Sequence, residues 1–213
     1  MFSMQKLRRD AERNRALILE AARQAFAEEG LRVTLDEIAR RAGVGVGTVY
    51  RRFADKDALV EALFEQRVGE IIELGHAALA EDDEWDGVVH WVYGMLGLVA
   101  ADRGLAEVVT STTYGRERVG EARAQIAPLA TRILERAQAA GRVRPDVRPG
   151  DFPMVTFMIG RLAEYTHEIA PELWRRYVAL LLDAMRTDRE LSQLPVPALE
   201  IEQFAAVMEQ KGL

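Results

Sequence analysis

The segment from Thr34 to Lys56 constrains the fold of this chain most, because it predicts two short helices joined by a tight turn. Thr34 and Glu37 have the spacing of a capping box, in which side chains satisfy free amides at the start of a helix. Gly43 closes that helix and can adopt the backbone conformation that a sharp turn needs. A second helix is expected over 47–53. The segment therefore predicts a helix-turn-helix.

The apolar residues of this segment predict a small core between the two helices. Leu35, Ile38 and Val49 are expected to pack together there. Phe53 is expected to hold the end of the second helix against the helix that comes before the helix-turn-helix, near Phe26. The remaining side of the second helix is then left to face outward.

The outward residues have the chemistry that duplex DNA requires. Free amides at the start of a helix attract phosphate, and glycines let a backbone approach it closely. Val46 can contact a thymine methyl group, and Arg51 or Arg52 can reach guanine edges in a major groove. Lys56 stands in the first turn of the next helix, where the helix dipole disfavours a cation, so we expect it to be exposed with a phosphate partner. The alternative is a helical hairpin with a solvated charged face, since this geometry also occurs in proteins that do not bind DNA.

Many positions between about 12 and 64 fit one signature in register. In and after the turn they are Ala42-Gly43-Val44-x-x-Gly47-Thr48-x-Tyr50-x-x-Phe53-x-x-Lys56-x-x-Leu59. In the preceding helix they are Ile18-Leu19-x-Ala21-Ala22 and Phe26-Ala27-x-x-Gly30. This pattern resembles the DNA-binding signature of the TetR family of transcriptional regulators. The resemblance implies a three-helix head on a larger helical body, and a homodimer that binds a palindromic operator in double-stranded DNA.

The resemblance also implies which residues line the operator. They are Thr34, Gly45, Val46, Gly47, Thr48, Tyr50, Arg51, Arg52 and Lys56. Gly45 departs from the family, because many members carry serine there. The departure removes a hydroxyl that could bind phosphate and keeps the backbone amide. A basic arm at the N-terminus could follow the DNA backbone or enter a minor groove; it comprises Lys6, Arg8, Arg9, Arg13 and Arg15.

The rest of the chain is also helical in pattern, so the expected fold class is all-α. Apolar residues recur at helical spacing, and no persuasive strand alternation is present. Helices are expected over 15–29, 35–42, 47–53, 56–79, 85–101, 117–141, 151–169 and 171–189, with shorter pieces over 103–114 and 199–210. We expect an arm and DNA-binding domain over 1–56, and a helical ligand-binding and dimerisation domain over 57–213.

The distribution of charge agrees with a protein that presents one end to phosphates. The net charge of the 213 residues is −6, yet residues 1–60 carry 12 basic and 9 acidic side chains. The chain has no cysteine, which excludes disulfides and thiolate metal sites. The acidic run 81–84 is interpreted as a loop at a helix start rather than a metal site. No cofactor, secretory signal or membrane span is expected, and the expected location is the cytoplasm.

Two of the body helices carry large, soft side chains that could line a cavity for a small-molecule effector. The candidate residues are Trp91, Met95, Phe157, Met158, Arg161 and Tyr165. The plain alternative, favoured for any one of them, is ordinary core. Arg161 needs a partner on this apolar face, and a pair with Glu164 is favoured over a clamp on a ligand carboxylate.

The last two long helices are expected to form the dimer interface as a four-helix bundle. One is expected to contribute a stripe of Leu173, Tyr177, Leu180, Leu181 and Ala184. On the other, Gly160 and Ala163 are small enough to permit close approach.

The function expected from these features is that of a repressor that an effector releases from its operator. An effector that changes the separation of the two heads would weaken binding, because each head must enter a successive major groove. The alternatives are an activator of the same family and a helical interaction module without DNA binding. An enzyme is not expected, since the three histidines are scattered and no nucleophile or phosphate-loop motif is present.

Overall fold

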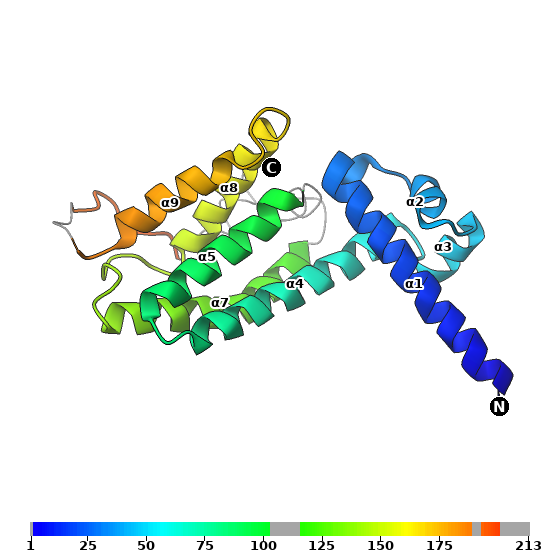
Figure 1. The fold of residues 1–213 in the computed structure, drawn as a ribbon, viewed down its shortest axis with the longest axis horizontal. Coiled ribbons are helices and arrows are strands. Elements are labelled where there is room, and N and C mark those ends of the chain that lie inside the picture. The colour runs from blue at the N-terminus through cyan, green and yellow to red at the C-terminus, as the bar shows by residue number, and fades with distance from the viewer. Residues whose placement is uncertain (1, 103–115, 189–192, 201–213) are drawn as a thin grey trace.

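The computed structural model describes residues 2–102, 116–188 and 193–200, and in these ranges the chain is all-α, as predicted. The helices are α1 (Phe2–Glu29), the 3₁₀ turn η1 (Gly30–Arg32), α2 (Leu35–Ala42), α3 (Val46–Arg52), α4 (Lys56–Ala80), α5 (Glu84–Ala101), α7 (Arg116–Ala139), α8 (Asp151–Thr166) and α9 (Leu173–Met185). Figure 1 shows α1, α2 and α3 gathered at one end, with α4 leading from them into the other helices. The pieces expected over 103–114 and beyond 200 lie outside the described residues.

Helix α1 begins far earlier than the expected start near Arg15. It runs from Phe2 to Glu29, and Figure 1 shows its N-terminal half projecting beyond the other helices of that end. The preceding stretch is rich in good helix formers and contains no glycine or proline. A helix continues through such a stretch once the buried half has nucleated it. The predicted basic arm is therefore helical.

The turn between α2 and α3 is built as the sequence predicts. Gly43 has φ +65°, and the amide of Val44 donates to the carbonyl of Ala39 at 3.1 Å, which closes α2 in a Schellman motif. Thr34 Oγ1 accepts from the amide of Glu37 at 3.3 Å. The other half of the expected capping box is replaced, because the Glu37 carboxylate accepts from Arg40 instead.

The buried apolar residues fall into two clusters, and α4 contributes to both. The first, which we call the head core, joins α1, α2 and α3 to the first half of α4 as far as Val68, and also includes Val99 of α5 and Ala122 of α7. Ile38 and Val49 are completely buried in it, and Phe53 and Phe26 belong to it as predicted. The second, the body core, begins on α4 at Ile71 and includes residues of α5, α7, α8 and α9. The domain division predicted at 56/57 stays a prediction, and the two cores divide inside α4.

Close backbone contacts fix α4 against α5. A Cβ on Gly87 would lie 2.6 Å from the carbonyl oxygen of Ala78, so only glycine fits at that crossing. Gly75 leaves room for the Trp91 ring, which is completely buried. Arg136 of α7 donates to the carbonyls of Leu79 and Glu81 at the end of α4. The cation satisfies carbonyls that a helix end leaves unpaired.

The acidic run at 81–84 caps a helix, as interpreted from the sequence. Asp83 accepts hydrogen bonds from the amides of Trp85 and Asp86 at 2.8 and 3.1 Å. These backbone bonds, that from Asp86 first, together with the nearby Arg142, hold the pKa of the Asp83 carboxyl below its ordinary value. In the described ranges, no helix is long and apolar enough to cross a membrane.

Candidate nucleic-acid interface

Helix α3 buries one side in the head core and presents the other to solvent. Val49 is 0% exposed, whereas Val46 is 41% and Tyr50 51% exposed. Gly45, Gly47, Arg51 and Arg52 are also exposed, and Thr48 is half-buried. The structure therefore brings the α3 residues predicted to line an operator together on one outward face. Exposed Thr34 lies at the start of α2.

The start of α3 leaves its backbone accessible. Gly45 is extended, with φ −67° and ψ 141°, and no side chain caps the first turn. A Cβ placed on Gly47 would meet nothing within 4 Å. Because the amides of a first helical turn lack partners inside the helix, this surface can accept an anion at close range.

The arginines of α3 differ from those of α2. In the described part of the chain, Arg51 and Arg52 form no ion pair, and Arg51 donates to Thr48 Oγ1 at 3.0 Å. Arg41, by contrast, pairs with carboxylates of α1 and α2, Glu28 at 2.8 Å among them. The guanidinium charges on α3 are thus left for an external acceptor, while that of Arg41 joins two helices.

Lys56 does not lie where the sequence argument placed it. Its side chain is half-buried, donates to the carbonyl of Leu31, and has its Nζ 6.0 Å from the centre of the Phe26 ring. The expectation of an exposed lysine that needs a phosphate was wrong on exposure, because a carbonyl distant in sequence already accepts from it. Whether Lys56 also touches DNA stays a prediction.

Helix α1 adds exposed cations to the same end of the molecule. Arg9, Arg13 and Arg15 are exposed, and the Arg15 guanidinium lies 5.7 Å from the centre of the Phe53 ring. The side chains of Lys6 and Arg8 lie outside the described residues. The basic residues of this arm were predicted from the sequence, but its helical conformation was not.

The candidate effector residues differ widely in how deeply they are buried. Trp91 and Met95 are buried in the body core, at 0% and 7% exposed. Met158 and Tyr165 of α8, by contrast, are 49% and 77% exposed. Phe157 is half-buried. Arg161 pairs with Glu164 at 2.7 Å and lies 5.5 Å from the Tyr165 ring centre, so the favoured pair is present.

The side of α8 that was expected at a dimer interface is therefore buried, and residues that were expected to line a cavity are exposed. Gly160 and Ala163, which we expected at a dimer interface, are buried, and Ala163 packs in the body core. Large apolar side chains of α8, α9 and the turn between them instead stay exposed. They are Met158, Tyr165, Ile169, Tyr177 and Leu180. Because α8 is apolar nearly all round, periodicity could not decide which face turned inward.

Two family models match the chain along most of its length. Residues 18–63 match the bacterial regulatory proteins of the tetR family. Residues 85–187 match the C-terminal domain of SbtR-like transcriptional regulators. A crystal structure of a TetR transcription regulatory protein from Mycobacterium vanbaalenii is 36% identical, with a TM-score of 0.62, and the match covers 85% of this chain and 99% of that one. The chain belongs to the TetR family.

Other relatives agree with this assignment over shorter or more divergent stretches. A helix-turn-helix-type transcriptional regulator of Staphylococcus aureus is 44% identical over 54 residues, which are 25% of this chain and 29% of that regulator. FadR from Bacillus subtilis, solved in complex with stearoyl-CoA, has the same fold at 18% identity, with a TM-score of 0.66 over 82% of this chain and 99% of that one. This TetR-family chain is thus a transcriptional regulator with a helix-turn-helix head, a non-enzymatic kind of protein.

Proposed function

We propose that this TetR-family regulator is a homodimeric repressor that grips a palindromic operator with α3 and leaves it when a small molecule binds the body. The observation that carries the proposal is the contrast within α3. Val49 is completely buried, while Arg51 and Arg52 in the last turn stand exposed without ion pairs in the described residues, on a helix whose start is uncapped and bears glycine. Unpaired cations and accessible amides are the groups that bind the phosphates of a polyanion such as DNA.

The proposed contacts divide into positioning and reading. The backbone at Gly45 and Gly47 and the hydroxyls of Thr34, Thr48 and Tyr50 would bind phosphates. Val46, Arg51 and Arg52 would read base edges, and Lys56 would add a phosphate contact. Contacts to phosphate fix the register of a protein on the duplex, whereas contacts to base edges give it sequence preference.

The outer face of α8 and α9 supports the proposed dimer. Met158 and Tyr165 of α8 and Tyr177 and Leu180 of α9 are all more than two-fifths exposed. Apolar side chains gathered in this way mark an interaction surface more often than a free one. A second copy would bury the same residues twice about a two-fold axis, and a two-fold axis is what the two halves of a palindromic operator require.

An effector site in the body is supported by the chemistry around Trp91. Its indole Nε1 is buried with no hydrogen-bond partner in the part of the chain that the structure describes. A buried donor without a partner is unfavourable, so a ligand acceptor atom that receives a hydrogen bond from this indole would stabilise the complex. Trp91 also packs against Gly75 of α4, the helix that leads to the head, which gives a bound molecule a route to the operator-binding end.

The test is a binding titration with duplex DNA from either side of the chain's own gene, followed by fluorescence anisotropy. Arg51→Ala and Arg52→Ala should each weaken binding by about 1–3 kcal/mol and leave the melting temperature unchanged. Arg40→Ala is the matched control, because Arg40 is exposed on α2 but pairs with Glu37. Equal binding by the wild type and both α3 variants to every duplex would overturn the proposal. A reporter gene that loses expression when the regulator is deleted would favour an activator.

A further inference from the structure

A buried ion pair lies where the head core ends. Arg67 of α4 donates from Nε and Nη2 to Asp102 Oδ2 at 3.1 and 2.8 Å, and from Nη1 to Glu70 at 2.6 Å. The side chains of Arg67 and Asp102 are only 13% and 8% exposed. Among the ion pairs of the described residues, it alone has both partners this deeply buried, which sets it apart from the surface pairs elsewhere.

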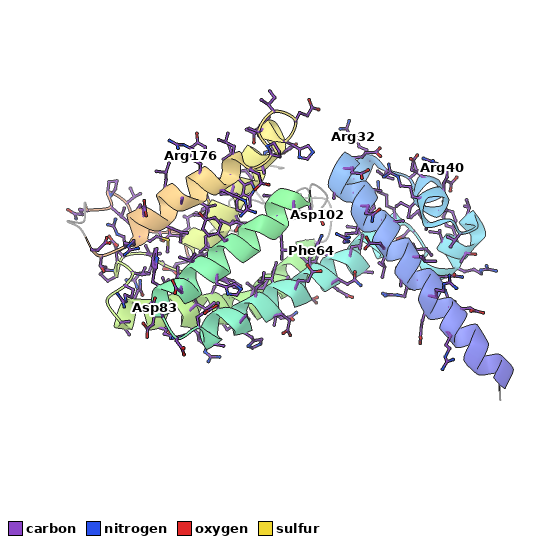
Figure 2. All side chains as sticks on the ribbon, viewed as in Figure 1. Arg32, Arg40, Phe64, Asp83, Asp102 and Arg176 are labelled. Atoms are coloured by element: carbon purple, nitrogen blue, oxygen red, sulfur yellow. The ribbon has the colours of Figure 1, made fainter. Side chains whose placement is uncertain are left out.

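The pair stands at the junction between head and body. Arg67 precedes Val68, the last α4 residue of the head core, and Asp102 directly follows α5. Figure 2 shows Asp102 at this end of α5, close to Phe64 of α4. Arg23 of α1 borders the same small cavity of about 30 Å³ as Arg67 and Asp102. The helix that opens the head, the connecting helix and the end of a body helix thus meet around one pair of charges.

The geometry of the pair makes it directional. Two donors on one planar guanidinium converge on a single carboxylate oxygen, so a rotation or slide of α4 against α5 would break both hydrogen bonds. The loss would pull apart two buried opposite charges, which disfavours such movement. Burial lowers the pKa of Arg67, but the hydrogen bonds to Asp102 and Glu70 more than compensate and raise it, so the guanidinium stays charged.

We propose that Arg67 and Asp102 are positioning residues that hold the DNA-binding head in one orientation on the body. The orientation matters because two heads must enter major grooves about one turn of DNA apart. The importance of this orientation for DNA binding rests on the proposed function, whereas the orientation of the head within one chain does not. A small rotation at the junction moves α3 further than it moves the residues at the junction itself.

The experiment measures the head-to-body distance by pulsed electron paramagnetic resonance between two spin labels. The chain has no cysteine, so Arg40→Cys on the head and Ala139→Cys at the far end of α7 give one labelled pair per chain. Both sites are exposed. Labelled chain is co-expressed with an excess of unlabelled chain, so that distances within one chain dominate whether the protein is a monomer or a dimer.

Asp102→Asn is then added to the labelled chain, and the operator affinity of the same variant without labels is measured. Asparagine keeps an acceptor and removes the charge. We expect the distance distribution to broaden and the affinity to fall by about tenfold, within the usual range of couplings between sites. Asp146→Asn is the control, since it removes the carboxylate that pairs with buried Arg144 at 2.5 Å, away from the junction. That control should change neither measurement.

Arg67→Lys carries the test if Asp102→Asn does not fold, because lysine keeps the charge and loses the planar fork. An unchanged distribution in a folded junction variant would overturn the proposal. A broadened distribution with unchanged operator affinity would overturn the link between head orientation and DNA. A broadened distribution in a protein whose wild type binds no duplex would contradict the proposed function and leave the positioning role supported.

Discussion

The head and the body of this regulator use their side chains in opposite ways. In the head, a small apolar core holds α3 so that polar and charged residues face outward, and these are the residues that the proposed function needs. In the body, the residues first suspected of function are divided between a buried core and an outer apolar face. A local motif thus locates a local surface, whereas a site assembled from distant helices depends on how they pack.

The largest effect should come from the body core. Trp91→Ala is expected to lower the free energy of unfolding by about 3–5 kcal/mol, because it empties the space of a completely buried ring. Urea unfolding followed by circular dichroism measures the loss. Tyr165→Ala on the exposed side of α8 is the control and should cost under about 0.5 kcal/mol. Similar losses for the two would contradict the division into core and outer face.

The outer face of the body should control assembly. Leu180→Asp is expected to weaken dimerisation by about 2 kcal/mol or more, because it places a charge at the centre of the proposed apolar contact. Sedimentation velocity over a range of concentrations measures this effect. Ala179→Asp adds the same charge at the neighbouring exposed position of α9 and should leave the dimer intact. A Leu180→Asp protein that stays dimeric would place the interface elsewhere.

In the head, adding a single methyl group should change stability and DNA affinity in opposite directions. Gly47→Ala is expected to raise stability by about 0.5–1 kcal/mol, since alanine favours a helix and its Cβ meets nothing. The same methyl should lower DNA affinity by about tenfold, because it stands between backbone and phosphate. Gly69→Ala on the exposed side of α4 is the matched control and should raise stability alone. Calorimetry and anisotropy supply the two readings, and unchanged affinity in Gly47→Ala would argue against close backbone approach.

The smallest effect should come from restoring the residue common in the family. Gly45→Ser is expected to add a few tenths of a kcal/mol of stability, because its hydroxyl can accept from an amide in the first turn of α3. A Cβ there meets only Thr48 Oγ1 at 3.9 Å, so the side chain fits without strain. DNA affinity should rise a few-fold if the hydroxyl also reaches phosphate. A fall in melting temperature would show that the start of α3 differs from the geometry described.

Much of the head could be predicted from the sequence because its features depend on near neighbours. The Gly43 turn, the Thr34 cap and the alternation of buried Val49 with exposed Tyr50 each involve residues a few positions apart. Body features of the same kind were also predicted, such as the acidic loop 81–84 at the start of α5 and the Arg161–Glu164 pair on a single helix turn. Residues a few positions apart become neighbours as soon as the helix or turn forms, so these contacts do not depend on how the helices pack.

What the sequence by itself determined, then, is the all-α class and the outward chemistry of α3, since helical periodicity and turn geometry act over short distances. The tertiary structure alone decided which face of α8 is buried, which carbonyl receives Lys56, and that Arg67 meets Asp102. The partners in the last two contacts are 25 and 35 positions apart. The physical reason is that such pairs form only when whole helices pack, and many packings would satisfy the same apolar pattern.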